Sequence, residues 1–128
     1  MNEGTNKSIV RVPTSLDTTF FRYWFEFLRP LHKLTDREID VITCFIKHRF
    51  ILSKVIHDEE LLDKVVMSED TKKKIIEECR LKPSHFQVIM GKLRQNKLIK
   101  DGKLNHKYIP SVSKDADGFK LLLYFDFQ

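Results

Sequence analysis

Residues 82–103, KPSHFQVIMGKLRQNKLIKDGK, combine side chains that form hydrogen bonds with side chains that carry positive charge. The apolar residues of this stretch recur at helical spacing, so the polar ones fall on the opposite side of the predicted helix. An amide can bind an adenine edge, a hydroxyl can bind a base or a phosphate, and an aliphatic side chain can contact a thymine methyl group. The candidates for such base contacts are Ser84, Gln87, Val88, Gly91 and Gln95.

A second group of side chains near this helix is basic. Lysine and arginine bind phosphates, and such contacts position a protein on nucleic acid without specifying a base sequence. The alternative is an ordinary solvated surface, but the clustering of lysines at the end of the helix and in the loop after it favours phosphate contact. The candidates are Lys72, Lys92, Arg94, Lys97, Lys100, Lys103 and Lys107. The base-contact candidates include no arginine, which favours weak or shape-based readout over guanine recognition.

Gly91 lies inside the predicted helix, where a glycine costs about 0.5–1 kcal/mol relative to alanine. Its place on the outward side suggests close approach by another molecule. A phosphate backbone, a base edge or the helix of another protein would each fit against the missing side chain. The alternative is a tolerated glycine that has no role.

Side chains suited to catalysis or metal binding are scattered along the chain. The histidines include no pair at the i, i+4 spacing of a helical zinc site, and the sequence has no glycine-rich phosphate loop or nucleophile turn. Cys44 and Cys79 each fall on the apolar side of a predicted helix without CxxC spacing. This pattern predicts buried free thiols and not a disulfide or a metal site. We therefore expect no enzyme activity, no metal and no cofactor.

The composition is that of a globular domain. A chain of 128 residues can bury one core, and 41% hydrophobic with 32% charged residues excludes a disordered or fibrous chain. The net charge of +5, from 23 Lys and Arg against 18 Asp and Glu, permits binding to nucleic acid without requiring it. The beginning, MNEGTNKSIVRV, lacks the apolar stretch of a signal peptide, and no apolar run is long enough to cross a bilayer. We expect no membrane association and a cytoplasmic location.

The first third of the chain is expected to hold an arm and an aromatic helix. Residues 1–13 form the arm, with a short strand at 9–12, and residues 14–33 form a helix capped by Ser15 or Thr18 and ended or kinked by Pro30. This helix is apolar most of the way round, so it must be buried on two sides, against the chain's own core or against a second subunit. The candidates for an oligomer interface are Phe20, Phe21, Trp24, Phe25 and Phe27.

Residues 34–128 are expected to form one domain. Thr35 and Glu38 predict a capping box, Ser68 can cap a later helix, and Pro83 suits the first turn of the helix over 83–97. Apolar residues occupy the places at which two helices pack across a tight turn: Ile75, Cys79, Leu81, Phe86 and Ile89. The pair Asp101-Gly102 predicts a two-residue hairpin turn. A strong strand over 119–127 is expected to complete a β-wing spanning 99–127.

This order of elements resembles a winged helix-turn-helix domain over residues 35–127, with the layout of MarR-like regulators. LTDREIDVI, at 34–42, is similar to the opening of LuxR-type and MarR-type domains, where it marks a scaffold helix. Two residues depart from the motif, because Ile76 takes the fifth place, usually Ala or Gly, and Arg80 the ninth, usually Gly. EDTKKKIIEECRLKPSHFQVIMGKLRQNKLIKDGKLN, together with KLLLYFDF, also looks like small proteins of crAss-like tailed phages.

The resemblance implies a mainly α fold with a small antiparallel β-wing (α+β), and it implies binding to duplex DNA. The first hypothesis is a transcription regulator, phage or bacterial, that contacts DNA through the helix at 83–97 and the wing at 99–127 and dimerises through the aromatic helix. The second is a phage virion structural or adaptor protein that uses the same fold to bind itself or other phage proteins. A virion protein would lie in the host cytoplasm or in the virion.

Overall fold

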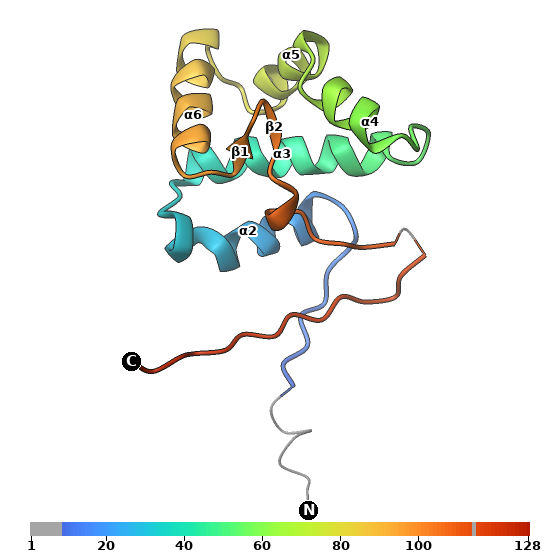
Figure 1. Ribbon diagram of the computed structural model, residues 1–128, viewed down its shortest axis with the longest axis vertical. Helices are drawn as coiled ribbons and strands as arrows, with labels where there is room; N and C mark the ends of the chain where they lie inside the picture. The colour runs from blue at the N-terminus through green and yellow to red at the C-terminus, as the bar shows by residue number, and fades with distance from the viewer. Residues whose placement is uncertain (1–8, 114) are drawn as a thin grey trace, which may run out of the picture.

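The computed structural model describes residues 9–113 and 115–128 (Figure 1). This part of the chain is mainly helical and has one small antiparallel sheet, so the α+β class expected from the sequence is confirmed. In chain order the elements are α2 (Thr18–His32), α3 (Asp36–Leu52), α4 (Glu59–Val66), α5 (Glu69–Glu78), α6 (Pro83–Gln95), β1 (Ile99–Lys100), β2 (Lys103–Leu104) and the 3-10 helix η1 (His106–Tyr108). None of the described helices is both long enough and apolar enough to cross a membrane.

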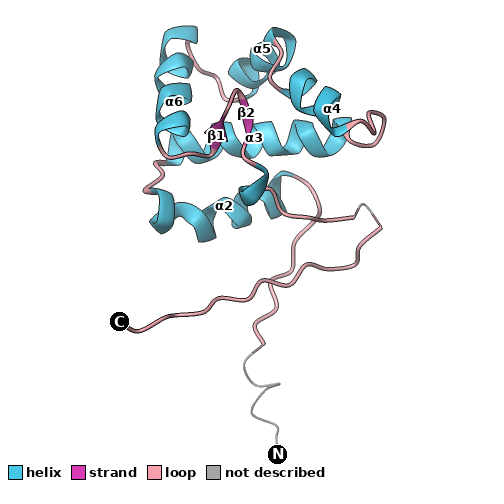
Figure 2. Cartoon of the chain, viewed as in Figure 1, coloured by secondary structure: helices cyan, strands magenta, loops and turns pink. Residues whose placement is uncertain are grey.

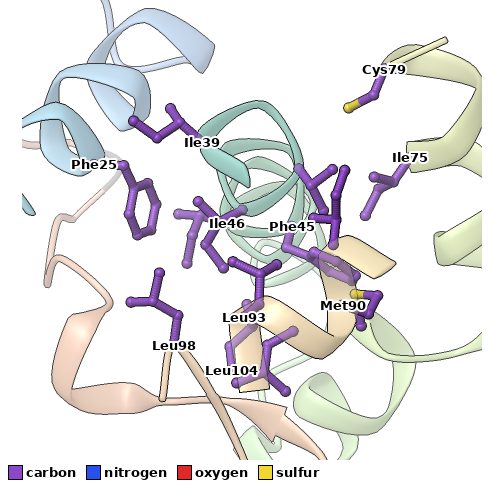
Figure 3. Close-up of a cluster of buried hydrophobic side chains, with 14 of the residues drawn as sticks. Phe25, Ile39, Phe45, Ile46, Ile75, Cys79, Met90, Leu93, Leu98 and Leu104 are labelled. Carbon is purple, nitrogen blue, oxygen red and sulfur yellow. The ribbon is translucent and has the colours of Figure 1, made fainter. Parts of the chain in front are cut away.

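Helix α3 lies at the centre of the fold and contacts α2, α4, α5 and α6 (Figure 1). It begins with the predicted capping box: the Thr35 hydroxyl accepts a hydrogen bond from the Glu38 N–H, and the Thr35 N–H donates to the Glu38 carboxylate, both at 3.2 Å. Because helices enclose α3 on several sides, much of its circumference is buried. Figure 3 shows Phe25, Ile75 and Leu93 approaching α3 from α2, α5 and α6.

Helix α2 begins four residues after the predicted start at residue 14 and ends one residue before the predicted end at residue 33. Asp17, and neither Ser15 nor Thr18, is the N-cap, and its carboxylate accepts a hydrogen bond from the Thr19 N–H at 2.8 Å. The helix continues through Pro30 to His32. Proline lies here in the last turn, where its missing N–H removes one hydrogen bond without unravelling the helix.

The aromatic side chains of α2 divide between the core and the surface. Phe21 and Phe25 are 2% and 1% exposed and belong to the hydrophobic core shared with α3. Their expected place in an oligomer interface is therefore corrected, because the chain's own core already covers both rings. Phe20 and Trp24 are half-buried, and Phe27 is 49% exposed.

Helices α5 and α6 are joined by residues 79–82. Ser68 caps α5 as predicted, its hydroxyl accepting a hydrogen bond from the Thr71 N–H at 3.4 Å, and Pro83 occupies the first turn of α6. Arg80 has a φ of +54°, in the left-handed region that glycine adopts at least cost. The ninth place of the motif therefore keeps the backbone conformation usually supplied by glycine, although the residue is arginine.

The hairpin after α6 has the predicted turn. Lys100 pairs with Lys103 in an antiparallel register, and Asp101 and Gly102 between them have φ values of +56° and +74°. Positive φ at both central residues is the requirement of a type I′ turn, which Asp-Gly satisfies. Leu104 is buried on the inner side of the hairpin.

The sheet is smaller than the sequence suggests. The expected wing over 99–127 narrows to the hairpin at 99–104, because residues 119–127 form no strand in the structure (Figure 2). The expected strand at 9–12 is likewise absent from the described chain. Period-2 apolar patterning predicts a strand only where a partner edge exists, and the two-residue strands β1 and β2 offer little edge to pair with. The beginning of the expected arm, residues 1–8, lies outside the described residues.

Candidate nucleic-acid interface

Helix α6 presents the predicted residues to solvent. Its inward side is buried through Phe86, Ile89, Met90 and Leu93, whose spacing of three and four residues places them on one side of the helix. The side opposite to them is exposed and carries all the base-contact candidates: Ser84, Gln87, Val88, Gly91 and Gln95. Val88 is a large apolar residue that is 61% exposed on this side.

Gly91 leaves the outward side of α6 without a side chain at one position. A Cβ atom added at Gly91 would have no neighbouring atom within 4 Å, so packing inside the described chain does not require a glycine here. The backbone of α6 is thus accessible at this point, and an approaching molecule can come closer to it than to the rest of the helix.

The basic candidates differ in how they are held. Lys72 is half-buried, and its Nζ lies 3.5 Å from a carboxylate oxygen of Glu69. The Lys107 Nζ lies 5.6 Å from the centroid of the Tyr108 ring. The others are exposed, and within the described residues no carboxylate lies at ion-pair distance from any of them: Lys92, Arg94, Lys97, Lys100 and Lys103. Their charges are therefore available to an external anion.

The net positive charge of the chain is concentrated in α6 and the hairpin. Residues 82–107 contain seven Lys or Arg and a single acidic residue, Asp101, which gives a net charge of +6. The remaining residues contain 16 Lys or Arg and 17 Asp or Glu, which gives −1. The overall net charge of +5 thus understates the positive charge around α6 and the hairpin, since one fifth of the chain carries all of the excess positive charge.

Two asparagines fix the hairpin to the end of α6. The Asn96 side chain accepts a hydrogen bond from the Leu98 N–H at 3.3 Å, and the Asn105 amide donates to the Lys97 carbonyl at 2.9 Å. Between them Lys97 takes a φ of +68° and reverses the chain. Neither asparagine was among the residues predicted from the sequence, although an asparagine that bonds to nearby backbone is a known turn signal. Their bonds set the direction in which Lys100 and Lys103 point relative to α6.

A buried carboxylate connects the end of the hairpin to α3 and α4. The Asp63 side chain of α4 is 6% exposed, and its oxygens lie 2.8 Å from His106 Nε2 and 3.2 Å from Arg49 Nε. A buried carboxylate needs such partners, because burying it unpaired would cost several kcal/mol. This contact holds η1, and with it the base of the hairpin, against the helices.

The surface of α2 is partly covered by the C-terminal segment. The centroid of the Phe119 ring lies 5.4 Å from that of Phe20 and 5.6 Å from that of Trp24, and both pairs of rings pack edge to face. Tyr23, Phe27 and Leu31, one turn apart, remain exposed along another side of the helix. Of the expected interface residues, Phe27 is therefore the one that remains largely accessible on the surface of the chain.

The two cysteines are brought together by the packing of α5 on α3. Cys44 and Cys79 are both free, and their Sγ atoms lie 3.5 Å apart in a weak hydrogen bond. That bond lowers the pKa of the Cys44 thiol, whereas for Cys79 the same bond, together with burial, raises the pKa. Free thiols were predicted, but their adjacency was not, because 35 positions separate them.

No protein-family model, curated protein or solved structure matches the chain.

Proposed function

We propose that the chain binds duplex DNA as a winged helix-turn-helix protein, with α6 in the major groove and the 99–104 hairpin along the phosphate backbone, and that it regulates transcription. One observation carries the proposal: the +6 charge of residues 82–107 against −1 elsewhere. Counterion release on phosphate binding supplies most of the affinity of DNA-binding proteins, and it requires unpaired cations on one surface. Lys92, Arg94, Lys97, Lys100 and Lys103 meet this requirement.

The geometry of α6 supports the same proposal. A major groove about 12 Å wide admits one helix, and the exposed Ser84, Gln87 and Gln95 offer groups that hydrogen-bond to base edges. At Gly91 the helix has no side chain to hold it away from the groove floor. The positive φ of Arg80 supports the proposal because it keeps, at the ninth place of the motif, the backbone conformation that glycine usually supplies there. The base-contact candidates include no arginine, so the proposed readout depends on the amide side chains, on contact with Val88 and on DNA shape.

The test measures binding of a labelled duplex by fluorescence anisotropy between about 50 and 200 mM salt, where each phosphate contact adds about −0.9 to the log–log slope. We expect a slope of about −4.5 for these five exposed cations. The double variant Gln87→Ala, Lys103→Ala is expected to bind more weakly. Its salt dependence should also be less steep, with a slope smaller in magnitude by about 1. Lys64→Ala, an exposed lysine of α4, is the matched control and should behave as wild type.

Two results would end the DNA-binding proposal. One is the absence of binding at the lowest salt concentration. The other is equal binding by the wild type and the Gln87, Lys103 double variant at both ends of the salt range.

A second function is favoured by a different observation, the exposed apolar surface. Tyr23, Phe27 and Leu31 on α2 suit contact with another protein more than contact with DNA. The corresponding proposal is a structural or adaptor protein, for example a phage virion component, that uses the same fold for assembly. It predicts a defined oligomer or complex in the absence of DNA, and light scattering that shows only a monomer would contradict it.

A further inference from the structure

The C-terminal segment, residues 119–127, leaves an unusual amount of apolar surface uncovered. FKLLLYFDF has the alternation and the residue types of a strand, yet its backbone forms no hydrogen bond with the backbone of the rest of the described chain. Leu122 is 89% exposed and Phe127 is 94% exposed. Contiguous apolar surface of this kind marks an interaction site.

One end of the segment is fixed and the other projects. Phe119 is held edge to face against Phe20 and Trp24 of α2. From Phe119 onward the exposed fraction of every second side chain rises: it is 42% at Leu121 and 54% at Leu123, and Phe127 is almost fully exposed. Figure 1 shows the segment running away from the helices to the C-terminus. The segment is therefore presented to solvent in an extended form, with its inner end already positioned.

We propose that residues 119–127 pair antiparallel with the same residues of a second copy of this chain, with Leu123 on the two-fold axis. In this register Lys120 lies opposite Asp126 at both ends of the ribbon, and Phe119 lies opposite Phe127. A two-fold interface must be self-complementary, and the sequence of the segment satisfies this condition for charge and for the aromatic rings together.

Other arrangements of the two strands lose this complementarity. A parallel in-register pair sets Lys120 against Lys120 and Asp126 against Asp126, and like charges directly opposite each other are destabilising. An antiparallel pair shifted by two residues sets Lys120 opposite Tyr124 or Gln128 and Asp126 opposite Gly118 or Leu122, so that neither charge meets its opposite. Of these arrangements, only the antiparallel pair with Leu123 on the axis forms both ion pairs, and this self-complementarity favours a second copy of the chain as the partner.

The domain itself supplies support for the ribbon. Two isolated strands are only marginally stable in water, so an apolar face has to rest on something. In the proposed register Phe127 of the second copy lies beside Phe119, which already rests on Phe20 and Trp24. The most exposed ring of each copy thus reaches the aromatic surface of α2 in the other copy. The inference does not depend on DNA binding, although a two-fold dimer would present two α6 helices.

Sedimentation equilibrium of the full chain across a range of concentrations tests the charge register. The wild type is expected to dimerise. Lys120→Asp and Asp126→Lys each place like charges together at both ends of the ribbon and should weaken the dimer about tenfold or more. The double variant Lys120→Asp, Asp126→Lys restores both pairs and should regain the wild-type dissociation constant. Lys64→Asp, with the same change of charge on exposed α4, is the control and should leave the dimer unchanged.

Cross-linking gives an independent reading of the axis. In the proposed register only position 123 faces itself, so Leu123→Cys should form an interchain disulfide under mild oxidation, and Leu121→Cys should form little. Directly opposite Cβ atoms lie at about 4.5–5.5 Å, close to the range a disulfide bridges. A monomer at all concentrations, a dimer insensitive to the single charge reversals, or equal cross-linking at both positions would overturn the proposal.

Discussion

The indole nitrogen of Trp24 donates a 2.8 Å hydrogen bond to the carbonyl oxygen of Tyr108 and thereby joins α2 to η1. This contact spans 84 positions of sequence and gives Trp24 a structural role in the folded chain. Trp24→Phe keeps an aromatic ring but leaves the carbonyl without its donor, at a cost of about 1 kcal/mol in the free energy of unfolding. Urea unfolding followed by circular dichroism measures this loss. Phe27→Leu, on the exposed side of α2, should stay within about 0.5 kcal/mol of wild type.

Arg80 holds a left-handed backbone conformation that costs a residue with a Cβ about 1–2 kcal/mol. Glycine relieves this strain but adds freedom to the unfolded chain, so we expect Arg80→Gly to stabilise the fold by about 0.5–1 kcal/mol. Arg80→Ala is the matched control, because it removes the guanidinium and keeps the Cβ. If thermal unfolding shows the same gain for Arg80→Ala, charge and not backbone strain is the cause.

Gly91→Leu should affect stability and binding in opposite directions. A leucine side chain at this position meets open space at its Cβ and improves helix propensity by up to about 1 kcal/mol, so the melting temperature should stay the same or rise. The added side chain should nevertheless block close approach to α6 and abolish DNA binding in the anisotropy assay. Thr19→Leu is the control, because it places a leucine at an exposed position of α2, and this variant should bind DNA as the wild type does. Unchanged binding by Gly91→Leu would show that the outward side of α6 is not in the interface.

Glu78 contributes stability that depends on pH. Burial disfavours its charged form, but hydrogen bonds from Lys47 and His48, both at 2.7 Å, outweigh burial and hold the pKa of Glu78 below its ordinary value of 4.5. A lowered folded pKa means that the contribution is present above about pH 4.5 and is lost as the pH falls through the folded value. Because Glu78 is 37% exposed, the contribution should be at most about 1 kcal/mol.

The corresponding measurement compares unfolding free energies of the wild type and Glu78→Gln from pH 7 to pH 3. The difference should be present at neutral pH and should shrink below about pH 4.5. Glu77→Gln serves as the control, because Glu77 makes no ion pair within the described part of the chain. A difference between wild type and Glu78→Gln that persists at pH 3 would contradict the assignment.

The adjacent thiols of Cys44 and Cys79 should be oxidised together by diamide. Each thiol gives up its hydrogen, one disulfide forms, and diamide is reduced to the hydrazine. Closing a loop of 35 positions should stabilise the fold by about 4 kcal/mol, provided the bond forms without distorting the helices. Mass spectrometry of the unreduced chain detects the loss of the two hydrogens, and Cys44→Ser should abolish the intramolecular product. Exclusive formation of interchain disulfides would show that the two sulfurs do not meet in solution.

The elements that the sequence predicted correctly have signals contained within a few residues. The capping box of Thr35 and Glu38, the cap at Ser68 and the Asp101-Gly102 turn are each fixed by hydrogen bonds or φ angles between near neighbours. The expected strand at 119–127 was wrong within the folded chain because strand formation also needs a partner edge. Alternation supplies a suitable strand but cannot supply the edge.

For the candidate site, the sequence by itself determined the two sides of α6, since helical spacing alone separates Phe86 and Leu93 from Gln87 and Gly91. The tertiary structure decided which side of α2 is buried, because the sequence of a helix that is apolar most of the way round does not reveal which side α3 covers. It buried Phe21 and Phe25 and left Phe27 exposed. It also decided that Asp63 holds the base of the hairpin against the helices, because Asp63 and His106 are 43 positions apart and meet only when the helices pack.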